Sequence, residues 1–205
     1  MIAYRTVARA ASAEIEVKRS RFLATIAGVD DEAAARGVDD AARRRHHDAR
    51  HHCSAFVIGP DAAVRRSNDD GEPAGTAGSP MLEVLTRRDV SDVVAVVTRW
   101  FGGTLLGAGG LVRAYGDAVG LALDAAGLQR RALRHTMSVQ ASPAEAGALD
   151  NRLRSLGVVT GVDYGESVVF TVNVTDPDQF ASELAGISAG GVTAHRTGSA
   201  WVDVP

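Results

Sequence analysis

The sequence predicts an α+β fold for this chain of 205 residues. In its first half, an almost unbroken β-branched run over residues 93–97 leads through a glycine-rich loop into an amphipathic helix. In its second half, strand and helix patterns follow in the order βαββαβ, which is typical of ferredoxin-like domains. Because the apolar pattern breaks near residues 128–134, we predict two domains, over residues 1–130 and 131–205.

The first elements are a strand pair and a helix. Residues 15–26 alternate in polarity and predict one bent strand or a hairpin, with the basic residues of 18–21 in its exposed part. A helix is expected over about residues 31–45, with Asp30 or Asp31 as its N-cap. It ends in three arginines, which either complement the helix dipole or bind a partner.

Two further strands and a helix are expected next. Residues 51–58 predict a strand, and residues 62–67 return beside it after a turn. Proline at position 80 suits the first turn of a helix, so either Ser79 or, a turn earlier, Thr76 is expected to cap that helix.

Between these elements lies an acidic turn, in which Asp69, Asp70 and Glu72 are held in a rigid loop. Carboxylates clustered in this way can hold Mg²⁺ or serve as acid and base, although acids in turns are more commonly solvated. A hydrolase or metal-dependent enzyme that uses this loop with His51 or His52 is therefore the alternative function. The main hypothesis is a protein without catalysis, cofactor or metal.

The glycine-rich loop contains Gly102, Gly103, Gly107, Gly109 and Gly110. It lacks the lysine of a phosphate-binding P-loop, and valine at position 112 breaks the dinucleotide fingerprint. The glycines serve either tight helix packing or a backbone cradle for an anionic partner at the start of the next helix, expected at about residue 111. If Gly109 or Gly110 needs a positive φ, a bulky substitution there costs more than ~1 kcal/mol.

Charge is uneven along the chain, although the total is only −3. Residues 1–130 hold 17 basic and 17 acidic side chains, so the whole net charge lies in residues 131–205. Neither half is a basic domain, and local clusters therefore carry any case for nucleic acid.

The second half has recognisable helix caps. Residues 142–145 form a capping box with proline at the first helical position, after a strand over residues 136–141. Asp176 and the proline after it repeat this signal for a short helix, and strands are expected over residues 158–164, 168–174 and 192–204.

Three stretches resemble the signature blocks of the YigZ/Impact family, in the family's order. They are DARHHC at residues 48–53, NDDGEPAGTAGSPML at 68–82 and VVTRWFGGTLLGAGGLVRAY at 96–115. The resemblance implies an N-terminal Impact domain similar to the second domain of a small-subunit ribosomal protein. It also implies a small C-terminal domain resembling a late domain of elongation factor G. Eukaryotic relatives act in translational control by binding an activator of a stress kinase.

We therefore expect a binding protein in translation regulation whose partner is RNA or the ribosome. A further alternative is a regulator of a stress response that binds a protein partner. The predicted nucleic-acid contacts are Arg99, Gly102, Gly103, Gly107, Gly109, Gly110, Arg113, Arg43, Arg44, Arg45, Arg65 and Arg66. The sequence shows neither a signal peptide nor an apolar run near ~18 residues, which predicts a cytoplasmic protein without a membrane partner.

Overall fold

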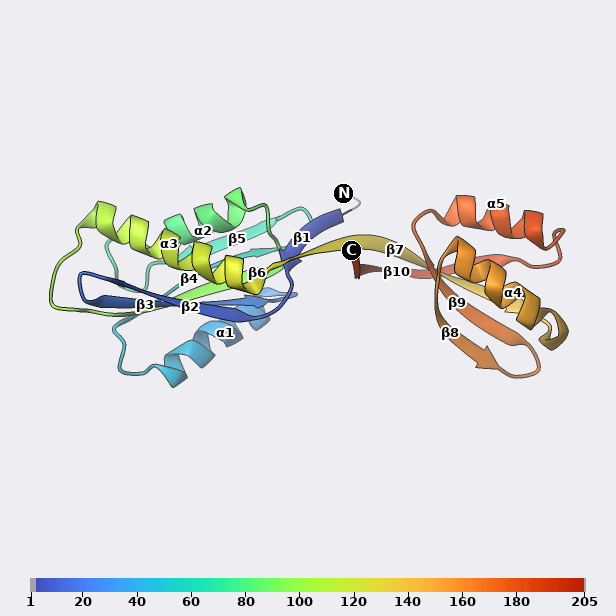
Figure 1. The fold of residues 1–205 in the computed structure, drawn as a ribbon, viewed down its shortest axis with the longest axis horizontal. Helices are drawn as coiled ribbons and strands as arrows, with labels where there is room; N and C mark the ends of the chain where they lie inside the picture. The colour runs from blue at the N-terminus through green and yellow to red at the C-terminus, as the bar shows by residue number, and fades with distance from the viewer. Residues whose placement is uncertain (1–2, 205) are drawn as a thin grey trace. The chain divides into compact units, whose positions relative to one another are not determined.

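The computed structural model describes residues 3–204 (Figure 1). Its packing divides the chain into two compact units. The first unit comprises residues up to Arg131 together with Val204, and the second comprises Ala132–Asp203. Both units contain helices and a sheet, which confirms the predicted α+β class.

The first unit is built on an antiparallel sheet with the strand order β2-β3-β6-β4-β5. A short strand, β1 (Ala3–Val7), precedes it. The sheet strands are β2 (Ala11–Val17), β3 (Ser20–Gly28), β4 (His51–Ile58), β5 (Val64–Asn68) and β6 (Val93–Trp100). Residues 15–26 thus form a hairpin, whose turn residues Lys18 and Arg19 both have positive φ.

Helices cover both faces of this sheet. Helices α2 (Gly78–Arg87) and α3 (Ala108–Ala126) pack on one face, and α1 (Glu32–Arg45) packs on the other (Figure 1). Strand β6 is buried by both layers, because Val93, Ala95 and Val97 join the α2/α3 core while Val94 and Val96 face α1. The β-branched run at the centre of the sequence is therefore the centre of the sheet.

Antiparallel pairing brings many connections to one end of the first unit. Arg21 pairs with Trp100, and His51 pairs with Arg99, so the β2–β3 turn, the end of β6 and the start of β4 lie together. Both α2 and α3 begin at this end, and α1 finishes there. We call it the loop end, made of residues 18–19, 46–50, 69–77 and 101–107.

The second unit confirms the ferredoxin-like pattern. Its elements are β7 (Leu128–Ala141, which begins in the first unit), α4 (Pro143–Leu156), β8 (Val158–Tyr164), β9 (Val168–Val174), α5 (Pro177–Ile187) and β10 (Ala194–Val204). Strand β9 lies between β7 and β8 and is antiparallel to both, while β10 pairs with β7. The capping box is formed, because the Glu145 carboxylate accepts a hydrogen bond from the Ser142 backbone N–H at 3.4 Å. The same carboxylate also accepts a hydrogen bond from the Ser142 hydroxyl at 2.6 Å.

Helix starts in the first unit differ from the sequence prediction in two places. Asp31 caps α1 as expected, accepting a hydrogen bond from the Ala34 N–H at 2.7 Å. Helix α2, however, begins at Gly78 with Ala77 as its N-cap, so the prediction of a Ser79 or Thr76 cap was wrong. Helix α3 begins at Ala108, earlier than predicted. No helix of residues 3–204 is long and apolar enough to span a membrane.

Candidate functional site

The acidic turn begins with Asp69, which holds the start of α2. Its carboxylate accepts hydrogen bonds from the backbone N–H groups of Gly75 at 2.7 Å, Ala77 at 3.0 Å and Gly78 at 2.7 Å. Burial alone would raise the pKa of Asp69, but these three hydrogen bonds outweigh it and hold the pKa below its usual value. Asp69 thus supplies the cap that neither Ser79 nor Thr76 provides.

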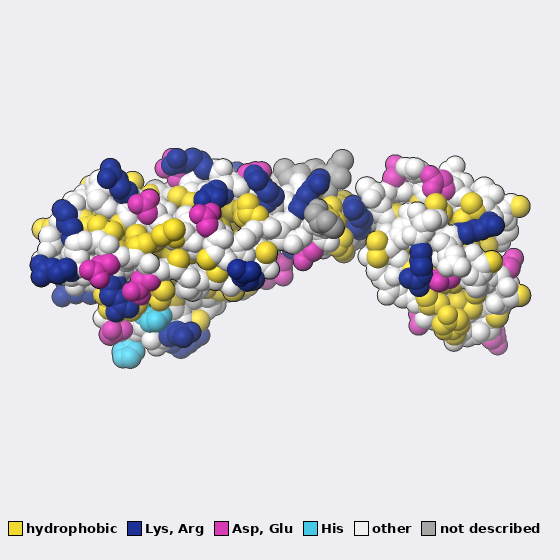
Figure 2. All heavy atoms as spheres, in the orientation of Figure 1, with side chains coloured by type: hydrophobic (Ala, Val, Ile, Leu, Met, Phe, Trp, Pro, Cys, Tyr) yellow, Lys and Arg dark blue, Asp and Glu magenta, His cyan; other side chains and the backbone are white. Residues whose placement is uncertain are grey.

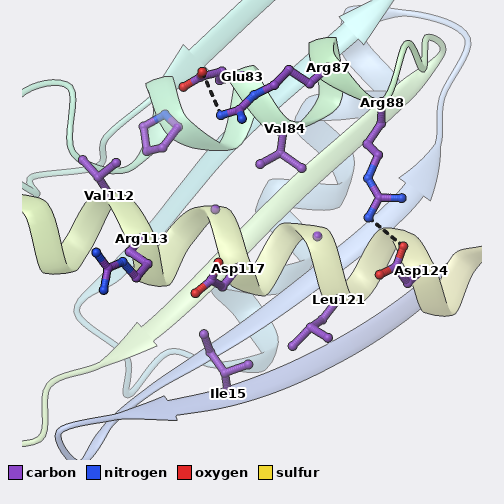
Figure 3. A pocket seen from close by; sticks show the side chains of 13 residues that line it. Ile15, Glu83, Val84, Arg87, Arg88, Val112, Arg113, Asp117, Leu121 and Asp124 are labelled. Carbon is purple, nitrogen blue, oxygen red and sulfur yellow. Dashed lines mark hydrogen bonds and ion pairs between the residues drawn. The ribbon is translucent and has the colours of Figure 1, made fainter.

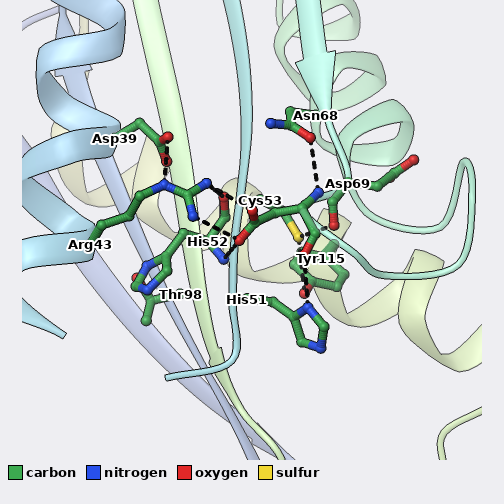
Figure 4. Close-up of polar contacts among 10 residues, drawn as sticks. Asp39, Arg43, His51, His52, Cys53, Asn68, Asp69, Thr98 and Tyr115 are labelled. Atoms are coloured by element: carbon green, nitrogen blue, oxygen red, sulfur yellow. Dashed lines mark hydrogen bonds and ion pairs between the residues drawn. The ribbon is translucent and has the colours of Figure 1, made fainter. Parts of the chain in front are cut away.

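Asp70 joins the turn to β4 and α1. Figure 4 labels the partners on these elements, His52 and Arg43. Its carboxylate accepts a hydrogen bond from the His52 N–H at 2.6 Å and forms an ion pair with Arg43 at 3.0 Å. Arg43 also pairs with Asp39 at 2.9 Å and donates to the His52 carbonyl oxygen. The first arginine of the predicted basic cluster therefore has three partners inside the protein.

Glu72 lies beneath the surface. Its Oε1 accepts hydrogen bonds from Arg99 Nη1 at 2.6 Å and from the Tyr115 hydroxyl at 2.7 Å. Tyr115 is also within 3.3 Å of the Cys53 sulfur, so β4, β6, α3 and the acidic turn share one buried polar cluster. Burial raises the pKa of the Tyr115 hydroxyl, and it raises that of the Cys53 thiol to about 12, which keeps both groups protonated near neutral pH.

The residues of the predicted enzyme alternative do not form a common centre. His52 is only 4% exposed, and its Nδ1 lies 3.1 Å from the Thr98 hydroxyl, whereas the His51 Nδ1 lies 2.9 Å from the Asp70 carbonyl oxygen. Burial lowers the pKa of His52. Within residues 3–204, no group of three or more His, Cys, Asp or Glu side chains is placed to hold a metal ion. The oxygens of the three acids instead accept hydrogen bonds that fix the fold.

The glycines of the loop have distinct roles. A Cβ at Gly102 would lie 2.1 Å from the Arg19 carbonyl carbon, so only glycine fits between the loop and the β2–β3 turn. Gly103 and Gly107 adopt positive φ angles of 86° and 74°. Gly109 and Gly110 lie inside α3 and neither has a positive φ, so the condition set for a costly substitution at these positions is not met.

A cavity of about 380 Å³ opens at the loop end between these segments. Its apolar wall comes from Phe101, Leu105, Leu106 and Leu111, and its polar wall includes Arg50 and Arg99. Phe101 is 40% exposed and Leu105 is 82% exposed. All three sequence stretches that carry the family resemblance contribute to the lining.

Further basic and aromatic side chains lie at the same end of the first unit but do not line this cavity. Arg44 and Arg45 are exposed at the end of α1, and neither forms an ion pair with another described residue. The Arg21 guanidinium lies 4.7 Å from the centre of the Trp100 ring. Figure 2 shows Lys and Arg side chains, with a few acids between them, at the end of the first unit where α3 begins. Sequence reasoning did not select Arg50, Trp100 or Phe101, although their places beside the histidines and the double glycine could have suggested them.

The remaining predicted contacts lie elsewhere in the first unit. Arg65 and Arg66 are exposed on the edge strand β5. Arg113 lines a second groove, of about 860 Å³, between α2 and α3 (Figure 3). In that groove Arg88 pairs with Asp124 and Arg87 pairs with Glu83, each at 2.8 Å. Arg113 has no ion pair within the described part of the chain.

Comparison with known proteins finds relatives over most of the chain. Residues 18–123 match the Impact N-terminal domain. The chain is 42% identical to the IMPACT family member YvyE of Bacillus subtilis, over 85% of this chain and 81% of that protein. It is 39% identical to the IMPACT family member YigZ of Escherichia coli, over 85% of this chain and 88% of that protein. A crystal structure of a hypothetical protein has a similar fold, with a TM-score of 0.66, 36% identity and coverage of 95% and 97% of the two chains.

Proposed function

This chain belongs to the Impact family, and we propose that it is a non-enzymatic cytoplasmic protein that regulates translation by binding RNA, on the ribosome or free of it. The binding surface is the loop end of the first unit. One observation carries the proposal: exposed basic side chains and partly exposed aromatic rings lie together there, while the three acids of the acidic turn are already bound within the protein.

The charges favour an anionic polymer. Asp69, Asp70 and Glu72 are each engaged by backbone N–H groups or by an arginine, so their negative charge is largely compensated. Lys18, Arg19, Arg44, Arg45 and Arg50 are exposed at the same end. Helices α2 and α3 also begin there and contribute the positive ends of their dipoles. A phosphate backbone is the ligand that such a surface attracts.

The aromatic side chains at the loop end favour single-stranded RNA, rather than an acidic protein surface, as the partner. The Trp100 ring contacts the Arg21 guanidinium, which also pairs with Glu14, and the His46 ring, whose centre is 5.3 Å away. Its indole N–H donates to Asp48, and Phe101 follows it in sequence. Where aromatic and basic side chains lie together, the rings can stack on bases while the basic groups neutralise phosphates. The acidic turn offers no comparable support for the hydrolase alternative, because its carboxylates already bind within the protein.

Salt-dependent RNA binding tests the proposal. Affinity of the intact protein for a fluorescently labelled single-stranded RNA should fall as salt rises, and ribosomes should retain the protein at low salt but release it at high salt. The double variant Arg44→Gln/Arg45→Gln should bind more weakly and reduce the slope of log K against log salt by about 1.4, or ~0.7 for each lost phosphate contact.

Arg36→Gln is the matched control, because Arg36 lies on the same helix away from the loop end and forms an exposed ion pair with Glu32. Its affinity and salt slope should equal those of the parent. If the parent fails to bind RNA or ribosomes at low salt, or if the double variant and the control bind alike, the proposal is wrong.

A further inference from the structure

We infer that the cavity in front of α3 binds a single nucleotide unit, with its phosphate at the start of the helix and its base against Phe101. This inference rests on the proposed function, and it names the part of the RNA that the loop end recognises. An unstacked nucleotide of a single-stranded RNA and a free mononucleotide carry the same chemical groups. The experiments below separate these two sources.

The start of α3 is left open, in contrast to that of α2. Both helices begin at the loop end, but the first N–H groups of α2 donate to the Asp69 carboxylate. Helix α3 begins after Gly107, no described side chain caps it, and its first turn contains no acid. Gly107 and Ala108 line the cavity. The positive end of a 19-residue helix thus meets an open space that is large enough for a ligand.

A buried arginine provides independent evidence for a ligand. Arg99 lines the cavity although it is only 5% exposed, and its Nε has no hydrogen-bond partner among residues 3–204. Its Nη1 donates to Glu72, which also lines the cavity, and its Nη2 donates to the Ser20 hydroxyl at 3.5 Å. Within the described part of the chain only Nε is left over, and the central carbon of the guanidinium lies 5.7 Å from the centre of the Phe101 ring. A buried donor without a partner is costly, which is consistent with a site that a polar ligand completes. Arg50, exposed at the rim, can approach the same phosphate.

The apolar wall fits a base. Phe101 and Leu105 keep large parts of their side chains in water, which is costly unless a partner covers them. A flat aromatic base covers such a wall by stacking and leaves its polar edge toward the rim. A cavity of about 380 Å³ lies within the size range of small-molecule sites. Because a base inside a duplex is already stacked and paired, the site selects single strands.

The first experiment removes the ring. Phe101→Ala should weaken binding of a short single-stranded RNA roughly 5- to 150-fold, which corresponds to the loss of one stacked base. Leu128→Ala is the control, because Leu128 is similarly exposed, at 43%, but does not line the cavity. It should bind as the parent does, and both variants should melt as one cooperative transition. Duplex RNA of the same length should bind the parent and Phe101→Ala equally.

The second experiment blocks the phosphate position without loss of stability. Ala108→Asp places a carboxylate at the first residue of α3, where an acid stabilises the helix and repels a phosphate. It should melt no lower than the parent and bind single-stranded RNA roughly 3- to 30-fold more weakly. Ala108→Asn has nearly the same shape without the charge and should lose less affinity.

Competition by adenosine monophosphate separates the inference from the proposed function. Displacement of the labelled RNA by the mononucleotide, lost in Phe101→Ala, supports a nucleotide cavity within an RNA site. If the mononucleotide binds and RNA does not, the cavity is supported and the proposed function is wrong. If RNA binds with the expected salt dependence but Phe101→Ala and Ala108→Asp bind as the parent does, the proposed function stands and this inference is overturned.

Discussion

Glu72 and Arg99, which lie 27 residues apart in sequence, form an ion pair with an O–N distance of 2.6 Å and side chains only 3% and 6% exposed. The pair joins the acidic turn to the end of β6. Through the Tyr115 hydroxyl, Glu72 also holds α3 against the sheet. It therefore connects two of the three stretches of sequence that line the cavity, residues 68–82 and 96–115.

Glu72→Gln should destabilise the first unit by about 3–5 kcal/mol, because it leaves the Arg99 charge buried without its counter-ion. Urea unfolding followed by circular dichroism measures this loss. Glu83→Gln is the control, since it removes an exposed ion pair with Arg87 worth ~0.3–0.5 kcal/mol. Equal unfolding midpoints for the two variants would show that the buried pair contributes no more than a surface pair.

Gly102→Ala should prevent the loop from packing on the β2–β3 turn, because the new Cβ would lie 2.1 Å from the Arg19 backbone. We expect a loss of more than ~2 kcal/mol or an unfolded first unit. Gly109→Ala provides the contrast, because that position is helical and open, and the change should stabilise the protein by roughly 0.5–1 kcal/mol. Thermal melts of both variants measure these changes in stability. A Gly102→Ala variant that melts at a higher temperature than Gly109→Ala would refute the roles given to the two glycines.

Asp69→Asn should cost about 1–2 kcal/mol at pH 7, because the amide keeps one acceptor and turns a donor toward a backbone N–H group. The lowered pKa of Asp69 means that its stabilisation is present above the unfolded-state value of about 4 and is lost as pH falls through the folded-state pKa. The stability gap between parent and variant should therefore narrow from pH 7 to pH 3 in urea titrations.

The exposed Asp61→Asn variant is the control for this pH series and should follow the parent throughout. If the difference in unfolding free energy between the parent and Asp69→Asn stays constant with pH, the charge of Asp69 is not the source of its stabilisation.

Arg113→Gln should leave the melting temperature nearly unchanged, because Arg113 is exposed and has no ion pair among the described residues. If the RNA extends from the loop end into the groove between α2 and α3, the variant should bind single-stranded RNA more weakly and reduce the slope of log K against log salt by ~0.7. Arg36→Gln again serves as the control. Equal affinity and slope in Arg113→Gln and the parent would remove Arg113 from the binding surface.

Local patterns in the sequence predicted most elements correctly. The β-branched run at 93–97 indicated a strand buried on both faces, Asp31 was a recognisable cap, and the βαββαβ order indicated the ferredoxin-like pattern. These predictions succeeded because they depend on neighbours in sequence and on the period of burial. The start of α2 was missed, since its cap comes from Asp69, eight residues before Ala77.

The fold class, the family and the stretches of chain that build the site can all be read from the order of the amino acids. What each side chain in these stretches does depends on the tertiary structure. Arg99 and Arg45 are the same kind of residue, yet antiparallel pairing buries one beside Glu72 and leaves the other in solvent. Likewise, the backbone of the distant Arg19 leaves no room for a side chain at Gly102, whereas Gly109 lies in the first turn of a helix with open space beside it. Burial and close approach depend on contacts between residues remote in sequence, which no local pattern records.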